Sequence, residues 1–148
     1  FRCPELVEGR RPELVEGLSA CFTEAIAYQR NNVINCRLGP GAVGVALVDH
    51  TSGMALGTIG GGKELDLTVA AAGNTDVVRA KLRAMEMLNI TEKIEDILIT
   101  LDSQYHLIRP LTSRAGKGLV LYVALRRDRS NLAMARHQLK RIENDLDV

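Results

Sequence analysis

The chain has 148 residues, of which 46% are hydrophobic, so we expect one globular domain with its own core rather than extensive disorder. The formal net charge is +1, which creates no overall field to attract nucleic acid or an anionic membrane. Two Phe, three Tyr and no Trp leave few stacking platforms for single-stranded nucleic acid.

Three cysteines, Cys3, Cys21 and Cys36, stand far apart and form no Cys-x-x-Cys pair, which argues against a zinc knuckle or a thioredoxin-type motif. The N-terminus lacks the apolar core of a signal peptide, and no run approaches the roughly 18 apolar residues of a membrane helix. We therefore expect a reduced, soluble, cytoplasmic protein.

The first 18 residues differ from the rest because they contain a direct repeat. The hexapeptide Pro-Glu-Leu-Val-Glu-Gly occurs at residues 4–9 and again at residues 12–17. Two copies are too short for a solenoid, and the recurring Pro and Gly disfavour a helix. The repeated hexapeptide resembles translated interspersed repeats of bacterial genomes. We expect residues 1–18 to be repeat-derived or disordered and residues 19–148 to form the domain; a linear docking motif is the alternative.

The domain begins with a predicted helix over residues 18–36, which ends before Leu38-Gly39-Pro40-Gly41. Two apolar extended runs then span Ala42 to Ile59 and flank Asp49-His50-Thr51-Ser52-Gly53. Asp and Gly are residues that tight turns require, so this stretch predicts a β-hairpin. A glycine-rich connection follows at residues 60–62.

A long helix is predicted from Glu64 to Leu88, and its apolar residues form two stripes at 100° per residue. A surface helix that covers one sheet needs only one stripe, so the second needs another partner. We favour the same helix of a second subunit over burial within the chain. One stripe comprises Val69, Gly73, Val77, Ala80, Ala84 and Met87; the other comprises Leu67, Ala71, Val78, Leu82 and Met85.

Three strands and a last helix complete the pattern. Residues 94–101 and 105–111 predict two strands joined at Asp102-Ser103-Gln104, with the second in a less buried place because it carries His106 and Arg109. Residues 119–125 are almost wholly apolar, as in a central strand covered on both faces. A final helix follows, with Asp128 or Ser130 as its expected cap.

The combined pattern resembles the roadblock/dynein-light-chain family, in particular small stand-alone bacterial members. The likeness covers about residues 20–146, and it rests on the strand Val45–Asp49 with Ser52-Gly53, on strands 96–101 and 105–111, and on the helix start at residues 131–136. It implies an α/β, roadblock-like (profilin-like) fold in the order α-β-β-α-β-β-β-α. The five-stranded antiparallel sheet would carry helices on both faces. The glycine-rich exit and the N-terminal repeat depart from the family pattern.

The resemblance also implies function. Roadblock proteins form homodimers whose third strands join edge to edge and whose second helices pack together, and they commonly regulate small Ras-like GTPases or act as adaptors in larger assemblies. They have no catalytic residues to carry over. We therefore expect a non-enzymatic regulatory module without a cofactor; a scaffold without a GTPase and a small-molecule sensor are the alternatives. The predicted dimer interface consists of Leu67, Ala71, Val78, Leu82, Met85, Ile97, Leu98 and Ile99.

For each candidate catalytic, anion-binding or metal-binding site, a structural explanation is favoured. Asp102, Ser103 and His106 are close enough in sequence for a nucleophile and base, but a strand turn explains them better. An anion seat at a helix start is one interpretation of residues 57–62, but a linker is favoured. Gly116-Lys117-Gly118 lacks phosphate-loop spacing. His50, His106 and His137 show no metal-ligand spacing.

A group of cations surrounds the last strand, and three interpretations compete for it: solvated ends, a nucleic-acid patch and a partner-binding patch. We favour solvated ends because Asp128 and the acidic tail residues Glu143, Asp145 and Asp147 dilute the charge. Neither nucleic acid nor membrane insertion is expected. The cations are Arg114, Lys117, Arg126, Arg127 and Arg129.

Overall fold

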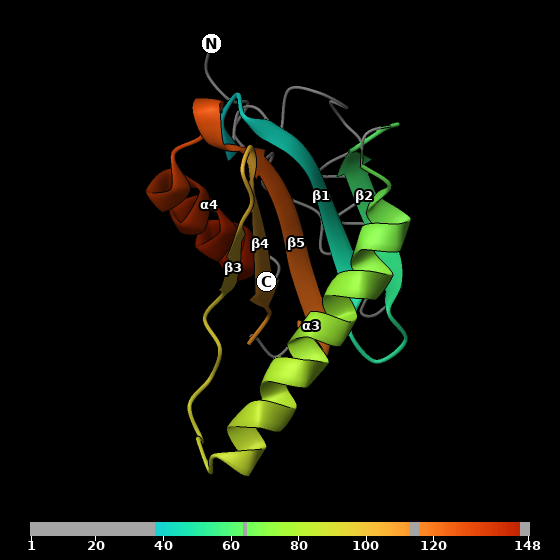
Figure 1. The fold of residues 1–148 in the computed structure, drawn as a ribbon, viewed down its shortest axis with the longest axis vertical. Helices are drawn as coiled ribbons and strands as arrows, with labels where there is room; N and C mark the ends of the chain where they lie inside the picture. Colours follow the sequence, from blue (N-terminus) through green and yellow to red (C-terminus); the bar gives the residue numbers. More distant parts are fainter. Residues whose placement is uncertain (1–37, 64, 113–115, 146–148) are drawn as a thin grey trace.

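The computed structural model describes residues 38–63, 65–112 and 116–145, and it shows one sheet with a helix on each face (Figure 1). The repeat at residues 1–18 and the predicted first helix lie outside the described residues. The elements are β1 (Ala42–Asp49), β2 (Met54–Gly60), α3 (Leu67–Met87), β3 (Ile97–Thr100), β4 (Gln104–Pro110), β5 (Leu119–Arg126), the short 3-10 helix η1 (Arg127–Arg129) and α4 (Leu132–Asp145).

The five strands form one antiparallel sheet in the order β2-β1-β5-β4-β3. β1 and β5 pair along their lengths, with Val45 opposite Val123 and Ala46 opposite Tyr122. Their near-continuous apolar sequences suit central positions, because neighbours cover both faces there. The antiparallel five-stranded sheet with helices on both faces confirms the fold class that the sequence predicts.

Alternate residues of the central strands enter two separate cores because successive strand side chains point to opposite faces. On one face, Ala46, Val48 and Tyr122 pack with residues of α3. On the other face, Leu47, Leu121 and Val123 pack with Ala135 and Leu139 of α4. The two helices therefore lie on opposite faces of the sheet (Figure 1).

The β1–β2 hairpin closes through the predicted turn chemistry. The Asp49 carboxylate accepts hydrogen bonds from the Thr51 amide and hydroxyl, at 2.9 and 2.6 Å. These bonds stabilise the charged form and lower the pKa of Asp49. Gly53 adopts φ +76°, and its amide donates to the Asp49 carbonyl at 2.7 Å. Asp49 and Gly53 thus act as turn residues, as predicted.

Helix α3 begins after Asp66, whose carboxylate accepts from the amides of Thr68 and Val69 and thereby caps the helix. The observed helix is slightly shorter than the predicted residues 64–88. It ends at Met87, and Asn89 follows with φ +54°. A left-handed residue terminates a helix because it turns the chain out of the helical path.

Two local predictions are wrong. β3 begins at Ile97 rather than at Ile94, because pairing with β4 starts only where Ile97 faces Ile108. The cap of α4 is Asn131, whose side-chain oxygen accepts from the Met134 amide at 3.1 Å. Asp128 lies within η1 and pairs with Arg126, so neither it nor Ser130 caps α4.

Candidate protein-interaction site

The two apolar stripes of α3 have opposite environments, and the structure decides which one covers the sheet. Leu67, Ala71 and Val78 are at most 5% exposed and belong to the core beneath the helix. Met85 is buried as well, whereas Leu82 remains 38% exposed. Leu67, Ala71 and Val78 are therefore already occupied within the chain, which corrects their assignment to an intersubunit surface.

The other stripe of α3 faces away from the sheet. Val69 is 68% exposed, Met87 is 84% exposed, and Val77 is 36% exposed. Ala80 and Gly73 are exposed too, and a Cβ atom built on Gly73 would meet nothing within 4 Å. An amphipathic surface helix normally carries polar residues on this side, so a continuous apolar strip there marks a candidate contact surface. We call these residues the outer stripe of α3: Val69, Gly73, Val77, Ala80, Ala84 and Met87.

Strand β3 forms one edge of the sheet, next to β4. Ile97 and Ile99 lie on the α3 side and Leu98 on the α4 side, and all three are half-buried. The start of the strand is anchored to α4, because Arg136 donates to both carboxylate oxygens of Asp96 at 3.0 and 3.1 Å. Within the described residues, no strand pairs with the outer edge of β3.

Helix α3 crosses the sheet obliquely, and its C-terminal part extends beyond the ends of the strands (Figure 1). The connection from α3 returns to β3 from that overhang (Figure 1). Leu88 and Ile90 on this connection are 65% and 41% exposed. The overhang therefore extends the apolar outer stripe toward the β3 edge.

Asp102 and Ser103 lie between β3 and β4, as the favoured strand-turn interpretation expects. His106 lies within β4, where its Nε2 is 2.9 Å from Gln104 Oε1 and its Nδ1 is 3.2 Å from the Tyr122 hydroxyl. The Ser103 carbonyl accepts from the Arg127 amide in the neighbouring turn. Both ring nitrogens of His106 thus have partners other than Asp102 and Ser103.

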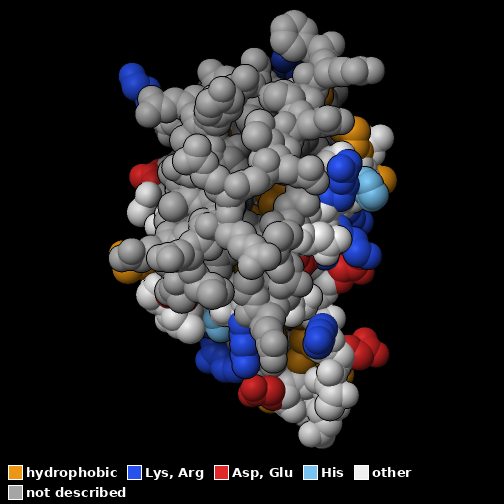
Figure 2. All heavy atoms as spheres, turned by 180° about the vertical axis from the view of Figure 1, so that it is seen from behind, with side chains coloured by type: hydrophobic (Ala, Val, Ile, Leu, Met, Phe, Trp, Pro, Cys, Tyr) orange, Lys and Arg blue, Asp and Glu red, His pale blue; other side chains and the backbone are white. Residues whose placement is uncertain are grey.

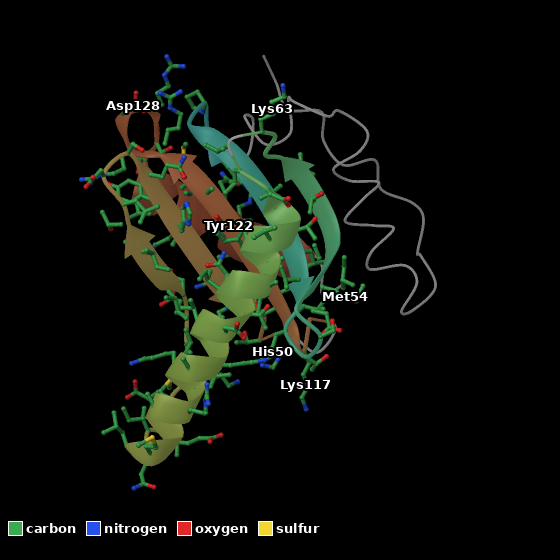
Figure 3. The ribbon with its side chains drawn as sticks, turned by 45° about the vertical axis from the view of Figure 1, so that its right-hand side comes forward. His50, Met54, Lys63, Lys117, Tyr122 and Asp128 are labelled. Carbon is green, nitrogen blue, oxygen red and sulfur yellow. The ribbon has the colours of Figure 1, made fainter. Side chains whose placement is uncertain are left out.

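Tyr122 lies on the α3 side of the sheet, beside the helix (Figure 3), and its ring meets that of His106 edge to face at a centroid distance of 5.5 Å. Burial raises the pKa of Tyr122 to about 12, despite a hydrogen bond with Asn74. Burial likewise lowers the pKa of His106, since the charged imidazolium is disfavoured there. This group is a polar contact between α3 and the sheet.

An ion pair that the sequence pattern did not predict connects β4 to α4. Arg109 Nε donates to Glu143 Oε2 at 2.8 Å, and both side chains are less than a tenth exposed. Glu143 Oε1 accepts from the amide and hydroxyl of Thr112. Burial opposes the charge of Glu143, but these bonds and the guanidinium outweigh it and lower its pKa. β4 is consequently more buried at Leu107, Ile108 and Arg109 than predicted.

Backbone amides in the glycine-rich connection have acceptors within the chain. The Gly61 amide donates to the Val43 carbonyl, and the Gly62 amide donates to the Leu65 carbonyl. At the start of α3, Asp66 already occupies two helix amides. These four amides therefore already have acceptors within the chain.

Two of the cations near the last strand have structural partners. Arg127 donates to the Leu101 carbonyl at 3.0 Å and lies 5.3 Å from the centre of the Tyr105 ring, so it holds the β3–β4 turn. Arg126 pairs with Asp128 at 3.4 Å. Lys117 lies at the opposite end of the sheet, near His50 (Figure 3), and Arg114 lies outside the described residues.

Among the described residues, no three or more His, Cys, Asp or Glu side chains are grouped so that they could hold a metal ion. Over the same residues, no helix has the length and hydrophobicity needed to cross a membrane.

No protein-family profile and no curated protein sequence matches the chain, but solved structures resemble it. MglB from Myxococcus xanthus is 20% identical over 72% of this chain and 74% of that chain, with a TM-score of 0.61. A Roadblock/LC7 domain from Streptomyces avermitilis is 16% identical over 78% and 89%, with a TM-score of 0.65. An MglB with a tetrameric arrangement is 15% identical over 93% and 95%, with a TM-score of 0.69.

At these identities the likeness shows the fold, and the chain has the roadblock fold. The resemblance that the sequence suggested is therefore confirmed at the level of architecture. Function on a shared fold is carried by particular surfaces, so it has to be argued from the outer stripe and the β3 edge.

Proposed function

We propose that this chain is a homodimeric, non-enzymatic regulatory or adaptor module that acts on a small Ras-like GTPase through protein contacts. The observation that carries the proposal is the outer stripe of α3, an apolar surface on the solvent side of a helix whose other side is already buried. Apolar surface of this kind is stabilised when a partner removes it from water.

The β3 edge supports a second copy as that partner. Two identical edge strands that pair antiparallel are related by a two-fold axis perpendicular to the sheet. Such an axis brings both α3 helices to the same face of a continuous ten-strand sheet. Edge pairing and contact between the outer stripes therefore satisfy the same symmetry. The tetrameric arrangement named for one MglB neighbour is consistent with self-association on this fold.

A corrected interface follows from this geometry. We assign it to the outer stripe of α3, to Leu82 and to Ile97, Leu98 and Ile99 of β3. Leu67, Ala71 and Val78 instead support it from below, because they hold α3 on the sheet. Met85 is 8% exposed and is likewise left out of the assigned interface.

The dimer is tested by Val77→Asp on the outer stripe, with Met54→Asp on β2 as the matched control. Both positions are exposed apolar residues, but Met54 lies on the strand at the opposite edge of the sheet. We expect sedimentation or light scattering to give a dimer mass for wild type and Met54→Asp and a monomer mass for Val77→Asp. A monomeric wild type, or a Val77→Asp variant that stays dimeric, would contradict the proposed interface.

The GTPase partner is tested with small Ras-like GTPases from the same genome, above all one encoded beside this chain. We expect binding that depends on whether the GTPase holds GDP or a GTP analogue, together with a changed rate of GTP hydrolysis. Dimers that bind none of the GTPases would favour the scaffold alternative. Stabilisation by a metabolite in a thermal-shift panel would instead favour the sensing alternative.

A further inference from the structure

The outward side of α4 is cationic. Its inward residues Ala135, Leu139 and Glu143 are buried against the sheet, so Arg136, His137, Lys140 and Arg141 fall on the exposed side. Figure 2 shows Lys, Arg and His side chains gathered along the side of the molecule that α4 forms. Arg129, in η1 just before the helix, is exposed as well. We call Arg129, Arg136, His137, Lys140 and Arg141 the cationic face.

Glu143, an acidic residue of α4, does not neutralise this face. Glu143 is the one acidic residue between Leu132 and Asn144, and its carboxylate is buried against Arg109 and Thr112. Asp96 neutralises Arg136. Within the part of the chain that the structure describes, Arg129, Lys140 and Arg141 take part in no ion pair. Because Glu143 is buried, it does not offset the positive charge on the exposed side of α4. The solvated-end interpretation counted Glu143 among the residues that reduce this charge.

We propose that the cationic face binds the surface of an anionic lipid membrane by adsorption, without insertion. This inference rests on the proposed dimer, because the two-fold axis perpendicular to the sheet places both α4 helices on one face, opposite both α3 helices. Three unpaired cations per protomer then become six on one side of the assembly. Clusters of about four to eight Lys and Arg are the size that binds anionic lipid headgroups.

The chemistry of the face favours a membrane over other polyanions. A protein partner would normally need an apolar centre with a polar rim, whereas four of the seven residues described as exposed in α4 are Arg, His or Lys and Met134 is the one large apolar side chain among the seven. Single-stranded nucleic acid would need aromatic platforms, and none of the residues of the cationic face is Phe, Tyr or Trp. Two α4 helices on one face of the dimer would present their cations together to a planar anionic surface, which attracts basic residues within about a Debye length.

The test compares sedimentation of the full chain with vesicles of phosphatidylcholine alone and with vesicles that also contain phosphatidylserine. The variant is Lys140→Glu/Arg141→Glu on α4, and the matched control is Lys63→Glu/Arg83→Glu, which changes the net charge equally at exposed positions before and on α3. The mass of every protein in solution is measured in parallel, so that dimer formation is read independently of lipid binding.

We expect wild type and control to bind phosphatidylserine vesicles at least about tenfold better than neutral vesicles and to be released at about 0.5 M salt. The α4 variant should lose this binding while remaining a dimer. The cationic face is not a lipid site if the wild-type dimer does not bind anionic vesicles. The same follows if the α4 variant and the control lose vesicle binding equally, or if the protein binds duplex DNA alone. A monomer that binds anionic vesicles through α4 overturns the dimer and supports the face.

Discussion

The buried carboxylate of Glu143 connects three segments of this fold. It joins α4 to β4 through Arg109 and to the following loop through Thr112. Because the pair is almost fully buried, removing one charge leaves the other without compensation in a poorly solvating environment.

We predict that Glu143→Gln lowers the free energy of unfolding by about 3 kcal/mol, because Arg109 would then be buried without an anion. Asp76→Asn is the control, since it removes a carboxylate from an exposed pair with Arg79 and should change stability by less than about 0.5 kcal/mol. Urea denaturation measures both. If both substitutions changed the free energy of unfolding equally, the buried Arg109–Glu143 pair would contribute no more to stability than the exposed pair.

His106 should make stability depend on pH near neutrality. Its pKa in the folded state is lowered below the ordinary value of 6.5 by burial, so the unfolded chain binds the proton more readily. Stability is therefore complete above about pH 6.5 and declines as the pH falls toward the folded-state pKa. We expect His106→Asn to flatten the melting temperature between about pH 5.5 and 7.5. An unchanged pH slope would contradict this role.

At the scale of helices and strands, we expect Gly→Ala substitutions to have opposite effects on stability in β2 and in α3. Gly60 has φ +71°, and a Cβ atom there would lie 2.5 Å from the Val43 carbonyl oxygen. Gly73 lies within α3, where a Cβ atom would meet nothing within 4 Å. Gly60→Ala should destabilise the protein by more than about 1 kcal/mol. Gly73→Ala should stabilise it by up to about 1 kcal/mol through helix propensity. Urea unfolding distinguishes them, and a destabilising Gly73→Ala would indicate close approach of another backbone to α3.

The whole molecule is expected to melt as a dimer. Any partner that binds only the folded state raises its stability by mass action, so the melting temperature should increase with protein concentration. We expect Val77→Asp to abolish this dependence while Met54→Asp retains it. Differential scanning calorimetry over a wide concentration range measures the effect, and a concentration-independent wild type would argue against the dimer.

Residues 1–18 are predicted to lie outside the folding unit. Deletion of this segment should leave one cooperative unfolding transition with nearly unchanged stability, because the repeat lacks the pattern of a helix or strand. Thermal denaturation followed by circular dichroism compares the truncated and full chains. Loss of the cooperative transition would show that the repeat contributes to the domain.

Much of the described fold could be read from local pattern. The hairpin at Ala42 to Ile59, the long helix and the apolar run at residues 119–125 were predicted close to their observed bounds, because turn residues and side-chain period act locally. The ends of β3 and the cap of α4 were missed. A strand begins where a neighbour is available, and a capping role depends on where the chain enters the helix.

The sequence by itself determined that α3 has two apolar stripes and that one of them exceeds what a sheet requires. Only the tertiary structure decided that Leu67, Ala71 and Val78 meet the sheet and that Val69, Val77 and Met87 face outward. Helical periodicity specifies the angle between two stripes but not the rotation of the helix on its sheet. That rotation depends on packing, as does the pairing of Glu143 with Arg109 across 34 residues of sequence, and both appear only when distant segments meet.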